Sequence, residues 1–575
     1  MSFHPSAVLE RRREQMFPTF TTAQVEAARR FGSAPRRFEP GQVLYPIGEV
    51  GTPAMLVLQG YIEVYRRDAL GNLERITCHM PAQIAGETSQ LAGGPTYVEG
   101  RAGPEGCEAV PFNAAQVRAL IVGNAEVGEI LMRAFILRRV ALIEAGAGTV
   151  LIGHEDAADS LRLQNFMRRN AVPHVLLDPA TDREAQQIVE RLAIREQDLP
   201  IVLCPDGSAM LRNPTERQLA KCLGLLPQFN AETTFDVAVV GAGPAGLATA
   251  VYAASEGLSV LVLDSRSFGG QAGASARIEN YLGFPTGISG QALAGRAFSQ
   301  AQKFGAVMAI PSEVKLLTCG MDCSPRVKAP SSPQDPPAPR RFMLTLDDDS
   351  QVRAASIVIA SGARYRRPDI PDLEQYEGRG VYYWASPLEA KLCARREVAL
   401  VGGGNSAGQA AVYLAGHASK VHIMVRGPGL SETMSRYLID RIRALPNVEL
   451  HTHTELRRLN GTPEEGLRSV TWRNRQTGEE DDCSASHVFL FIGADPNASW
   501  LQSCHVAVDA RGFIVTGAGA NDNAGARTPL PLETTQPGVF AVGDVRAGSV
   551  KRVSSAVGEG AAVVAQLHSY LAQAE

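Results

Sequence analysis

Two glycine-rich segments in this chain have the spacing of dinucleotide-binding loops. The first is FDVAVVGAGPAGLATAVYAASEGLSVLVLD, with Gly241, Gly243 and Gly246 in G-x-G-x-x-G order. In this order the first glycine permits a tight turn, the second lets the backbone approach a pyrophosphate, and the third lets the helix pack closely. The N-terminus of the helix favours the phosphate charge. Asp264 follows the second apolar stretch, where an acidic residue would hydrogen-bond a ribose hydroxyl.

The second segment is EVALVGGGNSAGQAAVYLAGHASKVHIMVR, which has the G-x-G-x-x-A form of the same loop. Its candidate nucleotide-binding residues are Gly402, Gly404, Asn405, Ser406 and Ala407. This segment ends in Arg426 rather than in an acid, and an arginine there suits the 2′-phosphate of NADP. Two dinucleotide-binding loops imply that the chain binds two nucleotides and that electrons or a chemical group pass between them. A flavin and a nicotinamide are the economical pair.

The elements that position these loops extend to a third motif near the C-terminus. LPLETTQPGVFAVGDVRAGSVKRVSSAVGEGAAVV places Gly543 and Asp544 after an apolar strand and before a helix. Together with ASIVIASGA at 355–363 and GGQAGASARIENYLGFP at 269–285, this pattern resembles the thioredoxin reductase family of FAD-dependent pyridine nucleotide oxidoreductases. The resemblance covers residues 235 to 570.

The resemblance implies two Rossmann-type α/β domains. An FAD-binding domain would be split between residues 235–352 and 490–575, with an NADP-binding domain at 353–489 inserted between the two parts. The residues that would line the FAD by this match are Gly270, Gln271, Asn280 and Asp544. Arg546 and Lys551 could add phosphate contacts, or they could be solvated surface residues. Members of the family also tend to carry further arginines after the position of Arg426, where this chain has Gly427 and Ser431.

The chain departs from the family where the redox cysteines would stand. In the family a Cys-x-x-Cys pair lies just upstream of the second glycine motif and receives electrons from the flavin. Here the segment reads GVYYWASPLEAKLC, with Trp384 and Pro387 at those two positions and a single thiol, Cys393, further on. A reduced flavin passes electrons to a disulfide through an adduct with one cysteine, and a second cysteine is needed to resolve that adduct, so one cysteine cannot complete the cycle.

Two aromatic residues of this segment are candidate catalytic residues. In the family the dithiol segment lies against the isoalloxazine ring in one orientation of the NADP-binding domain. The resemblance therefore implies that Trp384 or Tyr383 takes the place of the disulfide and covers the flavin or controls access to it. The alternative is that the YYW residues only pack between domains, as aromatic residues usually do.

Residues 146–228 predict an α/β domain that resembles thioredoxin. GTVLIGH, SLRLQNFMRRN, PHVLLD and DLPIVLCPDG give a strand–helix–strand order that ends in a proline before a strand. By the resemblance Pro200 would be the cis-proline beside the active dithiol. The dithiol position reads GHEDAADS and contains no cysteine, so the fold is expected without the thioredoxin chemistry.

Residues 1–145 predict a small β-barrel, because short alternating strands are separated by glycines. The segment resembles a cyclic nucleotide-binding domain, in which Gly86 and Glu87 would bond the ribose. The phosphate-binding arginine of that family corresponds to Thr96. Loss of the cation that neutralises a buried phosphate should cost several kcal/mol, so a cyclic nucleotide is a minority interpretation. The whole chain resembles bacterial fusions of these three kinds of module.

Composition limits the possible partners. The chain has 575 residues and a formal charge of -4, which gives no electrostatic footprint for nucleic acid. No apolar run approaches a membrane span, and the N-terminus has no signal-peptide pattern. We therefore expect a cytoplasmic protein whose nine cysteines are reduced thiols, with no metal site. A homodimer is expected from the family.

Three classes of function fit the sequence. The first is an FAD-dependent oxidoreductase that passes electrons between NADPH or a protein donor and an acceptor, protein or small molecule, that the sequence does not identify. The second is a thioredoxin-disulfide reductase that uses cysteines outside the usual motif, such as Cys393 with Cys204. The third is a non-catalytic flavin or nucleotide sensor. Two intact dinucleotide motifs in family order favour the first class over the third.

Overall fold

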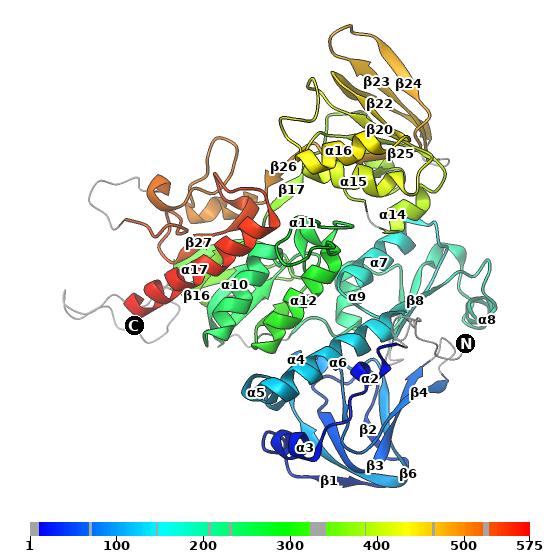
Figure 1. Cartoon of the computed structure of the whole chain (residues 1–575), viewed down its shortest axis with the longest axis vertical. Helices are drawn as coiled ribbons and strands as arrows, with labels where there is room; N and C mark the ends of the chain where they lie inside the picture. Colours follow the sequence, from blue (N-terminus) through cyan, green and yellow to red (C-terminus); the bar gives the residue numbers. More distant parts are fainter. Residues whose placement is uncertain are drawn as a thin grey trace. The chain divides into compact units, whose positions relative to one another are not determined.

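The computed structural model describes residues 11–67, 72–144, 148–204, 209–227, 229, 233–321, 341–385, 387–462, 466–520 and 528–574. Figure 1 labels those of their helices and strands for which there is room. The chain divides into two compact units. The first comprises residues 1–240, 250–268 and 297–356, and the second comprises residues 241–249, 269–296 and 357–575.

An antiparallel six-stranded sheet forms the part of the chain where a barrel was expected. Its strands pair in the order β1-β6-β3-β4, with β2 on β6 and β5 on β3 (Figure 1, blue). Among the described residues no pairing closes the sheet, so the structure does not show a barrel. The elements are α2 (Arg13–Met16), α3 (Thr22–Arg29), β1 (Arg36–Phe38), β2 (Val43–Tyr45), β3 (Ala54–Arg67), β4 (Leu73–His79), β5 (Ile84–Ala85), α4 (Ser89–Ala92), β6 (Glu99–Phe112), α5 (Ala114–Gly123) and α6 (Ala125–Glu144).

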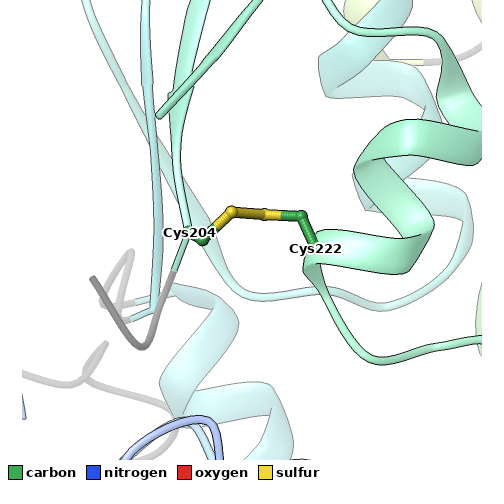
Figure 2. Close-up of a disulfide and its surroundings, with 2 residues drawn as sticks. All are labelled: Cys204 and Cys222. Carbon is green, nitrogen blue, oxygen red and sulfur yellow. A yellow bond between two sulfur atoms is a disulfide. The ribbon is translucent and has the colours of Figure 1, made fainter. Parts of the chain in front are cut away.

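A four-stranded sheet follows, in the order β10-β9-β7-β8. β7 is parallel to β8 and antiparallel to β9, which is antiparallel to β10. The Leu199–Pro200 peptide bond is cis, as the resemblance implies. Cys204, just after β9, forms a disulfide with Cys222 at the end of α9 (Figure 2). The elements are β7 (Thr149–Ile152), α7 (Ala158–Arg169), β8 (His174–Leu177), α8 (Arg183–Arg191), η1 (Glu196–Asp198), β9 (Ile201–Leu203), β10 (Met210–Arg212) and α9 (Glu216–Cys222).

A seven-stranded sheet carries the first glycine motif. Its order is β13-β12-β11-β16-β15-β14, with β27 paired to β16. β11, β12 and β13 are parallel, and β11 and β12 are rich in buried valine and leucine, as strands covered on both faces are. The elements are β11 (Thr234–Val240), α10 (Pro244–Ser255), β12 (Val260–Leu263), α11 (Gly270–Gly273), α12 (Gly290–Lys303), β13 (Val307–Ala309), β14 (Val314–Met321), β15 (Arg341–Leu346), β16 (Gln351–Ile359), β27 (Val539–Ala541) and α17 (Val553–Ala574). The predicted domain boundary at 352 and 353 falls inside β16.

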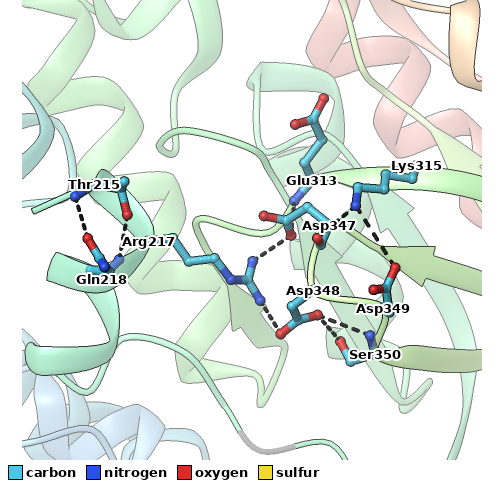
Figure 3. Close-up of polar contacts among 9 residues, drawn as sticks. All are labelled: Thr215, Arg217, Gln218, Glu313, Lys315, Asp347, Asp348, Asp349 and Ser350. Carbon is cyan, nitrogen blue, oxygen red and sulfur yellow. Dashed lines mark hydrogen bonds and ion pairs between the residues drawn. The ribbon is translucent and has the colours of Figure 1, made fainter.

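Within the first unit, Arg217 on α9 joins the four-stranded sheet's helix to the turn between β15 and β16. Its Nη1 lies 2.5 Å from Oδ1 of Asp347, and its Nη2 pairs with Asp348 (Figure 3). Lys315 on β14 holds the same turn by donating from Nζ to the backbone oxygen of Asp347 at 2.8 Å. Because the side chain of Arg217 is only 22% exposed, these ion pairs are better shielded from solvent than an ordinary surface pair.

The second glycine motif lies on a five-stranded parallel sheet in the order β18-β25-β19-β20-β21. Helices α15 and α16 pack on one face, where Leu400, Ala411 and Leu438 share a buried cluster. The antiparallel sheet β22-β23-β24 packs on the other face, with Met424 and Val470 in its cluster. The elements are β18 (Val381–Tyr382), α14 (Pro387–Leu392), β19 (Glu397–Val401), α15 (Asn405–Ala415), β20 (Lys420–Met424), α16 (Arg436–Ala444), β21 (Val448–His451), β22 (Thr454–Thr462), β23 (Gly466–Asn474), β24 (Glu480–Cys483) and β25 (His487–Leu490).

β17 (Ala363–Tyr365) and β26 (Ala494–Pro496) pair to form a two-stranded antiparallel ribbon. In the sequence, β17 precedes the strands of the five-stranded sheet and β26 follows them. The short helix α13 (Leu373–Tyr376) follows β17. None of the helices in the described ranges has both the length and the apolar character that crossing a bilayer requires.

Candidate functional site

The first glycine loop connects β11 to α10, and the backbone itself requires two of its glycines. Gly241 has φ +114, and a Cβ there would overlap the backbone oxygen of Ala360. A Cβ on Gly246 would overlap the backbone oxygen of Gly241. Any side chain at these two positions would therefore displace main-chain atoms. This is the tight turn and close helix packing that the motif predicts.

Gly243 differs from its two neighbours, because nothing in the chain prevents a side chain there. The nearest atom to an added Cβ is Cα of Gly270 at 4.0 Å, and the φ of Gly243 is not positive. The residue lies just before the N-terminus of α10, which begins at Pro244. The loop thus leaves an open cradle at a helix N-terminus, the arrangement that binds a pyrophosphate.

The other predicted FAD residues have different local environments. Gly270 has φ +53 and approaches Gly243, and the amide nitrogen of Gln271 donates to the backbone oxygen of Ala363. Asn280 is exposed. Asp264 follows β12, and its Oδ1 accepts hydrogen bonds from the backbone N–H groups of residues 266 and 267 at 2.9 and 3.1 Å.

The third motif forms a compact polar group around Glu559 of α17, which sequence reasoning missed. The backbone N–H of Gly543, at φ +73, donates to Oε2 of Glu559 at 2.7 Å. Arg546 is paired with the same carboxylate, with Nη2 to Oε1 at 2.5 Å. Lys551 donates from Nζ to the backbone oxygen of Asp544 at 2.6 Å. Burial raises the pKa of Asp544, and the charge of Lys551 opposes that rise.

These contacts show which charges of the third motif have partners within the chain. The side chain of Arg546 is 21% exposed, and its ion pair with Glu559 orients the guanidinium group. Arg546 and Glu559 also line a cavity of about 460 Å³ along α17. An acidic residue between two glycines, in GEG at 558–560, was the signal in the sequence that could have found Glu559.

The second glycine loop repeats the geometry of the first. Gly402 has φ +136, and a Cβ there would overlap the backbone oxygen of Phe491. Gly404, the N-cap of α15, has no atom within 4 Å of an added Cβ. Ala407, in the first turn of α15, is buried. In each loop the backbone itself excludes a side chain at the first glycine, Gly241 or Gly402. At the second, Gly243 or Gly404, the chain leaves space that a bound group could occupy.

The remaining residues of the second motif surround this loop. Oδ1 of Asn405 accepts a hydrogen bond from the backbone N–H of Ser435 at 2.7 Å, which fixes the side chain next to the loop. Ser406 is exposed. Arg426 is also exposed and comes two residues after Met424, which pairs with Val401 at the end of β19. Since adjacent parallel strands end at the same edge, Arg426 lies on the side of the sheet where the loop opens.

The segment without the cysteine pair is held by hydrogen bonds inside the same domain. The ring of Tyr383 stacks on Tyr365 with centroids 6.1 Å apart, and its hydroxyl donates to Glu377. Trp384 donates from Nε1 to Oε1 of the buried Glu389 at 3.0 Å. Trp384 is half-buried.

The cysteines differ from the expectation of nine reduced thiols. Cys204 is paired with Cys222, and this excludes the pair of Cys204 with Cys393 from the structure. Cys319 and Cys504 are also disulfide-bonded. Cys393 is fully buried, and burial together with the charge of Glu389 raises its pKa to about 12. A thiol in this state is not a nucleophile at neutral pH.

The residues expected to bind a cyclic nucleotide lie around a cavity of about 50 Å³ in the N-terminal sheet. Glu87 is paired with Arg139, with Oε2 2.8 Å from Nε, and Thr96 donates to the backbone oxygen of Pro46. Arg138, which also lines the cavity, donates to the backbone oxygens of Met16, Ile84 and Gly86. The cavity is thus far smaller than a nucleotide, and both arginines have partners in the chain.

Comparison with known families decides the class of the protein. Residues 235–560 match the model of the family described as "Pyridine nucleotide-disulphide oxidoreductase". The chain belongs to the pyridine nucleotide-disulphide oxidoreductase family. It is an FAD-dependent pyridine nucleotide oxidoreductase, and members of the thioredoxin reductase family use FAD and NADPH. The two open cradles at Gly243 and Gly404 fit these two dinucleotides.

Several relatives are similar over the same part of the chain. The thioredoxin reductase of Bacillus subtilis is 30% identical over 59% of this chain and 96% of its own length. The NADPH-dependent thioredoxin reductase 3 of Arabidopsis thaliana is 29% identical over 64% of this chain, but only 65% of the relative's length is covered. The crystal structure of thioredoxin reductase from Lactococcus lactis matches with a TM-score of 0.50 and 27% identity, over 59% of this chain and 100% of that one.

Proposed function

We propose that this chain is an NADPH-dependent flavoenzyme that reduces an acceptor outside the chain without a dithiol beside the flavin. The proposal depends on one observation, the replacement of the cysteine pair by the segment that contains Tyr383 and Trp384. Cys393, the nearest thiol in the sequence, is single, buried and protonated at neutral pH. FAD, when bound, accepts a hydride equivalent from nicotinamide and can release electrons in pairs or singly.

The chain's own residues supply binding and orientation. The loops at Gly243 and Gly404 each leave room for a pyrophosphate at a helix N-terminus. Arg426 is exposed, and its guanidinium would neutralise the 2′-phosphate of NADPH. The names of the relatives support different acceptors, since the similar proteins include a component of the alkyl hydroperoxide reductase of Pseudomonas putida and an NADH dehydrogenase of Bacillus subtilis. An anaerobic titration with NADPH, followed at the visible absorbance of the flavin, tests the proposal.

Trp384 is the residue that we assign to the place of the missing disulfide. Tyr383 is held by Tyr365 and Glu377, so its ring and hydroxyl already have packing contacts. Trp384 donates from Nε1 to Glu389 and is half-buried, and its flat indole ring is of the kind that can stack on an isoalloxazine ring. Stacking of this kind contributes on the order of 1 kcal/mol beyond burial.

Replacing Trp384 by alanine is expected to shift the flavin spectrum and to raise the rate of reaction with small oxidants about fivefold, the factor that corresponds to about 1 kcal/mol. Trp384→Phe keeps an aromatic face but not the bond to Glu389, and it should remain close to the native protein in both properties. Stopped-flow oxidation of the photoreduced proteins measures the rates. An unchanged spectrum and rate in Trp384→Ala would assign the aromatic segment to packing only.

A second candidate function is disulfide reduction through cysteines outside the usual motif. The observation that favours it is the Cys204–Cys222 disulfide at the end of β9, in a four-stranded sheet with a cis-proline (Figure 2). The strand order supports a thioredoxin-type fold for residues 146–228. A cyclic nucleotide-binding type of domain at 1–145, a homodimer and a cytoplasmic location stay predictions. The titration with NADPH also separates this candidate from the first.

A further inference from the structure

We propose that His422, Glu449 and His451 bind one divalent transition-metal ion, such as Zn²⁺, on the face of the five-stranded sheet that β22-β23-β24 covers. The proposal is separate from the two nucleotide loops and from electron transfer. The three residues lie on the neighbouring strands β20 and β21 at one edge of the parallel sheet.

The strand register places the three side chains on one face. His422 pairs with Glu449, and Met424 pairs with His451, in a parallel ladder. Side chains two residues apart on a strand point to the same face, so Glu449 and His451 share a face with His422. The ring of Trp472 on β23 lies 4.5 Å from that of His451 and 5.5 Å from that of His422, which identifies this face as the one under the antiparallel sheet.

The ligand atoms have the separations that one ion requires. Nδ1 of His422 lies 3.0 Å from Nε2 of His451. The carboxylate of Glu449 lies 4.0 Å from the first nitrogen and 3.8 Å from the second. Ligand atoms that share a zinc ion through bonds of about 2.0–2.2 Å are separated by distances of this size. Imidazole nitrogen with a carboxylate oxygen is a donor set that suits zinc, nickel or copper.

A second carboxylate orients His422 for this role. Oε2 of Glu397 lies 3.4 Å from Nε2 of His422 and accepts a hydrogen bond from the hydroxyl of Ser484 at 2.9 Å. When Nε2 carries the proton that Glu397 accepts, Nδ1 presents its lone pair to the ion. His451 then donates from Nε2 to that lone pair in the metal-free chain. On metal binding, the His451 proton moves to Nδ1 of the same ring, so no net proton is lost.

The site is closed on one side and open on the other. The side chain of His422 is 6% exposed and that of His451 is 19% exposed, whereas Glu449 is 49% exposed. An ion and its water can therefore enter past the glutamate. Lys420 occupies this entrance in the metal-free chain, with Nζ 2.6 Å from Oε2 of Glu449. The carboxylate already binds a cation there, and Zn²⁺ would displace the ammonium group.

Titration of the EDTA-dialysed full-length flavoprotein with ZnCl₂, followed by isothermal calorimetry, tests the site. The native protein is expected to bind one Zn²⁺ per chain. His451→Gln and Glu449→Gln should each weaken binding by about tenfold or more. His417→Gln, an exposed histidine of the same domain, is the matched control and should bind as the native protein does. A thermal unfolding transition like that of the native protein shows that each variant is folded.

Lys420→Met adds a test in the opposite direction. Removing the competing ammonium group should tighten Zn²⁺ binding, because Glu449 no longer has to release a cation. No stoichiometric binding by the native protein, or equal affinity in the native protein, His451→Gln and Glu449→Gln, would overturn the proposal. Weaker or unchanged binding by Lys420→Met would overturn the assignment of Glu449 as a ligand.

Discussion

Replacing Gly243 by valine is expected to give a folded chain that has lost its FAD. The backbone at Gly243 tolerates a side chain, since its φ is not positive and the nearest atom to an added Cβ is 4.0 Å away. The valine would instead occupy the cradle at the N-terminus of α10. Forcing a side chain into space that a bound group needs costs about 1–3 kcal/mol or more, which lowers affinity by tenfold or more.

The measurement is the ratio of flavin to protein after purification, with thermal unfolding of the flavin-free chain as the check on folding. Gly246→Ala is the contrasting variant, because its Cβ would overlap the backbone oxygen of Gly241 and should destabilise the fold itself. A Gly243→Val protein that keeps its full yellow colour would contradict the assignment of this loop to FAD.

Replacing Gly404 by valine is expected to leave FAD in place and to abolish reduction by NADPH. The added side chain meets no atom of the chain within 4 Å, so the fold should be unaffected, but it fills the cradle at the N-terminus of α15. Anaerobic stopped-flow mixing with NADPH measures the loss, and photoreduction shows that the flavin can still be reduced. Normal reduction by NADPH in Gly404→Val would contradict the assignment of this loop.

Arg426→Ala is the milder companion variant at the same site. It should still be reduced, but with the preference for NADPH over NADH lowered by about 1–3 kcal/mol, the value of one charge-assisted contact. Equal rates with NADH and NADPH in the native protein would show that Arg426 does not select the phosphate.

The sequence predicted those features that depend on neighbouring residues. Both glycine loops could be predicted because a strand, a turn and a helix N-terminus are contiguous in the chain. In the structure, a Cβ added at Gly241 or Gly402 would overlap backbone atoms, which explains why these residues are glycines. The cis peptide bond before Pro200 was implied by the resemblance and is present. The predicted boundary at 352 and 353 stays a prediction, and β16 crosses it, since that strand runs from Gln351 to Ile359.

Features that depend on strand pairing or on distant segments could not be predicted. Cys204 and Cys222 are 18 residues apart, in no recognised spacing, and only the packing of α9 beside β9 brings them together. Glu559 meets Arg546 because α17 lies against the turn after β27. His422 and His451 are 29 residues apart, and only the register of β20 with β21 places their nitrogens 3.0 Å from each other.

The number of electrons that the protein takes up per FAD tests the central claim most directly. An anaerobic titration of the purified protein with NADPH counts these electrons while the visible absorbance of the flavin falls. Without a redox dithiol beside the flavin, we expect the absorbance change to be complete after one NADPH, which delivers two electrons. An end point at two NADPH per FAD, with new thiols at Cys204 and Cys222, would contradict the account and establish a disulfide reductase.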